Sequence, residues 1–164
     1  MPEQRNDDQY DNEAEVPVKG YAALAGTFAA GATLFTVTAW RRGLRLPDQV
    51  PPWDVALLGT ATFKASRLLS RDKVTSFLRA PFTRRAEDGA AGEVTDESRG
   101  GEARRAVGDL VTCPFCTSVW VAAALTGTYA CAPRAARMLA AGLTAVTMAD
   151  WLQYAWTRTQ ASVE

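Results

Sequence analysis

The stretch from Leu110 to Pro133 constrains the fold more than any other part of the chain. It contains no charged side chain and opens with Cys-Pro-Phe-Cys at Cys113–Cys116. A bilayer has a hydrocarbon core of about 30 Å, which roughly 20 mostly apolar helical residues can cross. The stretch therefore predicts a membrane-spanning helix over 110–133, and the Cys-Pro-Phe-Cys tetrad would lie where this helix meets water.

Composition narrows the chemistry that the chain can support. Its 164 residues include 18 basic and 18 acidic side chains, and this balance indicates no nucleic-acid partner. The chain has no histidine, which excludes Ser-His-Asp triads, His-activated cysteine nucleophiles and histidine metal ligands. Three cysteines are too few for a disulfide framework, since one would be left over.

The N-terminal part of the chain divides into a polar segment and an apolar one. Residues 1–16 are acidic and have little to bury, which is typical of a disordered tail. Residues 17–49 are predicted to form a first transmembrane helix and a loop. The apolar part, Gly20–Trp40, is uncharged and is flanked by the basic residues Lys19 and Arg41, as in many membrane helices.

A membrane domain is predicted over residues 50–157. We expect its helices at about 51–70, 110–133 and 135–156, with a flexible loop at about 84–106, where charged residues, glycine and alanine dominate. Two alternatives remain open for 51–70. It is either a spanning helix whose basic side chains snorkel to the interface, or an amphipathic helix lying on the membrane surface.

The fold class expected from these segments is an all-α, integral membrane helical bundle of four transmembrane helices, with three as the alternative. The segment from Arg71 to Arg105 is the most basic, which places it in the cytoplasm. Four spans then give a multi-pass protein of the cell membrane with both termini in the cytoplasm. Arg41 and Arg45 would face outside, against the positive-inside tendency, and this conflict disappears if 51–70 does not cross.

The unusual polar groups converge on one depth in the four-span arrangement. Lys64, Arg67 and Asp72 lie where the second helix ends, and Asp150 lies where the fourth ends, so Asp150 is the natural counter-ion for Lys64 or Arg67. Interfacial anchoring and helix–helix ion pairing explain these charges. A functional site is the alternative, including a pore around them that would require a homo-oligomer.

The tetrad supports three interpretations. Cys113 and Cys116 are redox candidates, because a helix N-terminus and nearby basic groups lower a thiol pKa. They are also metal candidates, although a zinc site needs four ligands. The simplest interpretation is packing beside Pro114, which starts a helix, with Trp120 packing on a neighbouring helix. No cofactor is expected if the cysteines only pack. The redox alternative would imply a quinone, and the metal alternative would imply zinc.

Two segments together resemble a known family. ATFKASRLLSRDKVTSFLRAPFT (61–83) and CPFCTSVW (113–120) are similar to the bacterial membrane family called domain of unknown function 1360, some of whose members carry sporulation-associated labels. The resemblance covers roughly residues 53–156. It implies a membrane location and supplies no reaction. Carried over, the family's recurrent positions are Lys64, Arg67, Asp72, Thr75, Arg79, Pro81, Cys113, Pro114, Cys116 and Trp120, which adds Arg79 to the polar cluster.

The function expected from the sequence is a non-enzymatic structural or interaction role in the lipid bilayer. The lack of catalytic groups other than thiols motivates this expectation. The alternative is a membrane thiol–disulfide or metal-binding protein that uses the Cys113/Cys116 pair at the cytoplasmic end of a transmembrane helix. The sequence identifies no protein partner.

Overall fold

The computed structural model describes residues 16–162, so the predicted disordered tail lies almost entirely outside the described residues. The described chain is mostly helical, with one small sheet. In chain order its elements are α2 (Val18–Arg41), α3 (Pro52–Ser70), α4 (Ser76–Arg79), β1 (Thr83–Asp88), the short 3-10 helix Ala90–Gly92, β2 (Val94–Ser98), α5 (Glu102–Thr112), α6 (Pro114–Cys131) and α7 (Pro133–Ala161).

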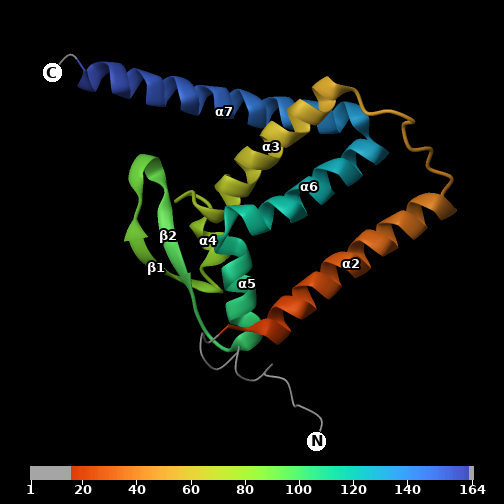
Figure 1. Cartoon of the computed structure of the whole chain (residues 1–164), viewed down its shortest axis with the longest axis horizontal. Helices are drawn as coiled ribbons and strands as arrows, with labels where there is room; N and C mark the ends of the chain where they lie inside the picture. Colours follow the sequence, from red (N-terminus) through yellow and green to blue (C-terminus); the bar gives the residue numbers. More distant parts are fainter. Residues whose placement is uncertain (1–15, 163–164) are drawn as a thin grey trace, which may run out of the picture.

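Helices α3, α6 and α7 pack on one another and form the central bundle (Figure 1). Ala61 of α3 and Ala136 and Ala140 of α7 are completely buried, and their small side chains allow the helices to approach closely. Each of the three helices begins with proline in its first turn, where the missing N–H has no partner to lose. Helix α7 continues well beyond the bundle toward the C-terminus.

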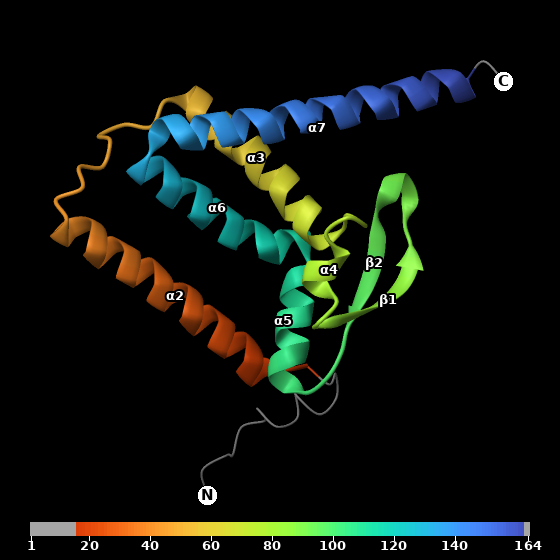
Figure 2. The ribbon, with the colours of Figure 1, turned by 180° about the vertical axis from the view of Figure 1, so that it is seen from behind.

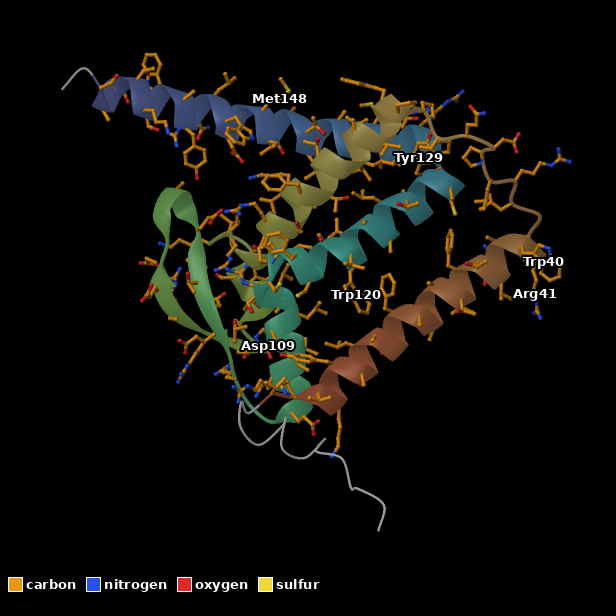
Figure 3. The ribbon with its side chains drawn as sticks, in the orientation of Figure 1. Trp40, Arg41, Asp109, Trp120, Tyr129 and Met148 are labelled. Carbon is orange, nitrogen blue, oxygen red and sulfur yellow. The ribbon has the colours of Figure 1, made fainter. Side chains whose placement is uncertain are left out.

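Helix α2 lies apart from this bundle, and its main contact is with α5, near the start of α2. Gly20 packs so closely on Ala106 of α5 that a Cβ on Gly20 would lie 2.5 Å from the Ala106 Cβ. Further along, Phe28 and Trp120 meet edge to face at 5.2 Å, so Trp120 packs on a neighbouring helix as predicted (Figure 3). Among the described residues, α2 is the one single helix long and apolar enough to cross a membrane.

The uncharged stretch 110–133 is not one straight helix, which corrects the prediction made from it. It is divided between α5 and α6, which meet at 81° and would make a second candidate span only as a bent pair. Cys113 has extended backbone angles, φ −100° and ψ 107°, as a residue before proline generally must. The helix therefore stops at Thr112 and restarts at Pro114.

The flexible loop predicted over 84–106 is wrong, and the predicted all-α class is confirmed only as a mostly helical fold, because this segment forms a two-stranded sheet. β1 and β2 pair in antiparallel fashion, with Arg84 opposite Glu97, and α5 follows (Figure 2). The inward side of β2 consists of Val94 and Asp96, whose side chains are both buried. Because one inward residue is a carboxylate, the alternation of apolar and polar residues that indicates a strand is missing from the sequence.

Candidate functional site

The turn after α3 fastens the hairpin to the helical bundle by main-chain hydrogen bonds. Lys73 N–H donates to the Gly92 carbonyl at 3.0 Å, and Val94 N–H donates to the Arg71 carbonyl at 2.8 Å. Asp72 and Glu93 form a single β-bridge between these two bonds. We call this region, residues 71–98, the hairpin junction.

Arg79 is the centre of the hairpin junction. It is only 1% exposed, and its Nε donates to Asp96 Oδ2 at 2.8 Å. Its other nitrogens donate to the carbonyl of Leu69 at 2.7 Å, to Thr75 Oγ1 at 3.0 Å and to the carbonyl of Asp72 at 3.1 Å. A buried arginine with this many acceptors joins the end of α3, α4 and β2 into one unit. The structure therefore separates Arg79 from the polar cluster that the sequence grouped it with.

A cavity of about 570 Å³ opens beside the hairpin junction. Its lining comes from α3, from the hairpin turn and from the part of α7 around Asp150 and Tyr154. Cavities of this size suit small ligands or single head groups. We call it the interfacial cavity, and it brings together Lys64, Arg67, Asp72 and Asp150, four of the five residues predicted as a polar cluster.

The cationic side chains of the interfacial cavity each have a carboxylate partner. Lys64 Nζ lies 2.7 Å from Asp150 Oδ2, which is the pairing predicted from the sequence, and the Lys64 side chain is 11% exposed. Arg67 pairs instead with Glu93 of the hairpin and lies over the ring of Phe63, with 5.9 Å between the guanidinium carbon and the ring centroid. The sequence analysis did not predict Glu93 as the partner of Arg67, because Glu93 belongs to the segment that was predicted to be a loop.

Asp72 differs from the other charged groups of the cavity. Within residues 16–162 its carboxylate makes no hydrogen bond and no ion pair, although its backbone carbonyl accepts from Arg79 and Thr75. Burial raises the pKa of the Asp72 carboxyl; Lys64 and Arg67 act against this rise, whereas Glu93 and Asp150 add to it. The cavity therefore holds one carboxylate whose charge is not matched by a direct partner.

The tetrad cysteines lie at the start of α6 with free thiols. Cys113 Sγ accepts a hydrogen bond from the Cys116 backbone N–H at 3.2 Å, so Cys113 acts as the N-cap of α6. Cys131 lies at the opposite end of the same helix. Within the described residues, no group of three or more His, Cys, Asp or Glu side chains is arranged to hold a metal ion.

A second polar network, not anticipated from the sequence, closes the opposite end of the bundle. Asp54, 5% exposed, accepts from the Tyr129 hydroxyl at 2.6 Å and from Arg137 Nη2 at 2.6 Å. Arg137 also lies over the Tyr129 ring, with 5.5 Å between the guanidinium carbon and the centroid. Tyr129 marks this end of α6 in Figure 3. The network ties the starts of α3 and α7 to the end of α6.

A third network joins α2 and the hairpin through Asp109 of α5. Its carboxylate accepts from Tyr21 at 2.7 Å and from Ser98 at 2.6 Å. Gly108 beside it is essential for this packing, because a Cβ there would lie 2.7 Å from Ser98 Cβ and 2.8 Å from the Phe82 carbonyl oxygen. A sequence signal existed in Gly108-Asp109, where glycine marks a close backbone approach.

Comparisons with known proteins identify a family for this chain. Residues 57–156 match the family model described as "Protein of unknown function (DUF1360)". The chain is 32% identical over 110 residues to "Sporulation protein YjcA" of Bacillus subtilis (strain 168), covering 60% of this chain and 93% of that protein. No solved structure matches the chain. The family match begins within α3, ends within α7 and includes all of α6 and the hairpin junction, and the chain belongs to the DUF1360 family.

Proposed function

We propose that this chain is a multi-pass protein of the cell membrane with a non-enzymatic structural or interaction role, and that the hairpin junction is its cytoplasmic contact surface. The exposed apolar surface of α2 is the observation that carries the proposal. None of its most apolar 18-residue window is buried, and Leu34 and Trp40 are 68% and 79% exposed. Its 24 residues extend about 36 Å at 1.5 Å per residue, which matches a hydrocarbon core of about 30 Å.

The directions of the helices support four spans. α2 starts beside α5 and the hairpin, α3 ends there, α6 starts there, and the Asp54 network gathers the opposite ends of α3, α6 and α7 (Figures 1 and 2). Consecutive long helices therefore run in opposite directions. Such an arrangement suits repeated crossing of one bilayer. The hairpin junction carries five Lys and Arg residues, and the positive-inside tendency, which counts these residues rather than net charge, favours the cytoplasmic side for it.

The interaction role rests on the surface of the hairpin junction. Val74 and Phe77 are 84% and 68% exposed although both are large and apolar. They follow Arg71 and Lys73 closely in the sequence. Exposed apolar side chains next to charged ones are typical of contact sites. The name of the B. subtilis relative suggests sporulation as the cellular context of this role.

Single-cysteine labelling tests the topology. In a background with Cys113, Cys116 and Cys131 changed to serine, Asp48→Cys lies in the loop between α2 and α3, and Asp88→Cys lies at the end of β1. A membrane-impermeant maleimide added to intact cells should label Asp48→Cys and leave Asp88→Cys unlabelled until the membrane is opened. Labelling of neither residue before opening would favour three spans, and extraction of the protein by alkaline carbonate would contradict membrane insertion altogether.

A thiol function is the second candidate, favoured by one observation: two free thiols lie one helical turn apart at the start of α6. Removing them tests it against the structural role. The structural role predicts that Cys113→Ser/Cys116→Ser retains the cellular function of the wild type. Loss of that function with normal protein abundance would establish the thiol alternative.

A further inference from the structure

The interfacial cavity differs chemically from a second large hollow among the described residues. A groove of about 770 Å³ lies between α2 and α6, and no charged side chain of the described residues lines it. The interfacial cavity is smaller, and five charged residues share its lining with three aromatic rings. Its composition therefore indicates a polar ligand with an apolar part.

Charge counting gives the sign of that ligand. Lys64 is paired with Asp150, and Arg67 is paired with Glu93, so these four groups neutralise one another. Asp72 remains, half-buried and without a direct partner among the described residues. A partly buried carboxylate without a counter-ion is costly, and a positively charged ligand removes that cost. An anion would instead have to displace a carboxylate from Lys64 or Arg67.

The aromatic residues specify which kind of cation fits. Trp151 and Tyr154 line the cavity from α7 and are 68% and 51% exposed, so their rings have no protein layer over them. The Phe63 ring across the cavity already has the Arg67 guanidinium over it. An ammonium group next to an aromatic face gains cation–π attraction, which suits primary and quaternary ammonium groups better than small, strongly hydrated metal ions.

We propose that the interfacial cavity binds the ammonium group of an organic cation, with Asp72 as its counter-ion and with Trp151 and Tyr154 contacting its apolar face. This site goes beyond the structural role proposed above. It is formed by residues that contact one another within a single chain, and it does not depend on the direction in which the chain crosses a membrane.

The test uses the full chain in non-ionic maltoside micelles, with tetramethylammonium as the probe and ligand-observed NMR as the measurement. We expect saturable binding with a dissociation constant of about 1 mM or lower. Asp72→Asn and Tyr154→Ala should each weaken it at least about tenfold. The matched controls are Asp48→Asn, in the loop before α3, and Trp53→Ala, in the first turn of α3. They change the same kinds of side chain at the opposite end of α3 and should bind as the wild type does.

Three results would overturn the site: no saturation by about 10 mM probe, unchanged binding in both cavity variants, or equal losses in the cavity and control variants. If Asp72→Asn does not fold, Tyr154→Ala still tests the site. The Tyr154 side chain is about half exposed, so its loss should leave the fold intact. Thermal unfolding of each variant identifies a folding defect independently of probe binding.

The ammonium group could belong to a lipid head group or to a soluble amine, and nanodiscs separate these sources. Binding of tetramethylammonium is measured in discs of phosphatidylglycerol with a neutral glycolipid, and in discs with the same phosphatidylglycerol fraction in which phosphatidylethanolamine replaces the glycolipid, so that the surface charge is equal. Weaker probe binding in the second kind of disc identifies the lipid head group as a competitor for the site. Equal binding in both identifies a soluble cation.

Discussion

The hairpin junction and the interfacial cavity lie side by side, and residues 67–79 contribute to both, yet their polar groups are used differently. Thr75 and Arg79 direct their side chains into the junction, where every nitrogen of the Arg79 guanidinium has an acceptor. Arg67 and Asp72 direct theirs toward the cavity, where Asp72 has no direct partner among the described residues. A fully satisfied network stabilises a fold, whereas an open one is available to a ligand.

The largest effect is expected from Arg79→Met in the junction. This change leaves the buried Asp96 carboxylate without its partner and should lower the free energy of unfolding by about 3–5 kcal/mol. The matched control is Arg84→Met. Arg84 pairs with Glu97, the neighbour of Asp96, but both side chains are more than half exposed, so the expected loss is about 0–1 kcal/mol. Chemical unfolding of both variants in micelles measures the difference. Equal losses of unfolding free energy would contradict a buried, fully hydrogen-bonded Arg79 in the junction.

A smaller loss is expected from Gly108→Ala, which tests how tightly α5 holds the hairpin. The added methyl group would meet the Phe82 backbone and Ser98, and overpacking of this kind costs about 1–3 kcal/mol. Gly142→Ala in α7 is the control, because no atom lies within 4 Å of the new Cβ, and it should stabilise the helix by about 0.5–1 kcal/mol. Unfolding free energies that change by the same amount in both variants would contradict the close approach.

The capping role of Cys113 predicts a modest effect beside the junction. Cys113→Ala removes the acceptor for the Cys116 N–H and should cost about 0.5–2 kcal/mol, whereas Cys113→Ser keeps an acceptor and should cost less. Unfolding of the two variants under reducing conditions gives the comparison. A larger loss in the serine variant would mean that the sulfur atom packs rather than caps.

The smallest change, and one of opposite sign, is expected from Asp72→Asn in the cavity. Because the pKa of Asp72 is higher in the folded chain than in the unfolded chain, folding favours its protonated form, and the ionised form destabilises the fold. Asparagine should therefore raise the unfolding temperature slightly at neutral pH. As the pH falls through the folded-state pKa the wild type regains this stability, so the two curves should converge. If Asp72→Asn were less stable than the wild type at every pH, the Asp72 carboxylate would have stabilising partners in the fold, as Arg79 does.

The sequence predicts the mostly helical character of the chain, because apolar runs and prolines in a first helical turn are local signals. Pro52 begins α3 close to the predicted start of that helix. Pro133 was expected to end a helix and instead begins α7, and the helix predicted over 110–133 restarts at Pro114. The pairing of Lys64 with Asp150 was also predictable, because both charges interrupt apolar runs at one depth.

The remaining features depend on contacts between distant residues. Asp96 can face inward because its carboxylate pairs with the buried Arg79. The sequence of β2 therefore lacks the alternation of apolar and polar residues that would indicate a strand. Asp54 looks like an ordinary acidic residue in a first helical turn, and its role depends on Tyr129, 75 residues further along the chain. The bend at Cys113 had a local signal, the following proline, but the length of the uncharged stretch outweighed it in the prediction.

Hydrogen–deuterium exchange of the full chain in micelles tests most directly the central claim that residues 67–79 fasten an ordered hairpin to the bundle. The amides of Lys73 and Val94, which bond across the junction, should exchange slowly in the wild type and rapidly in Arg79→Met. Their exchange in Arg84→Met should remain slow. Rapid exchange of both amides in the wild type would mean that this segment is a loop after all, and the account of the junction would be wrong.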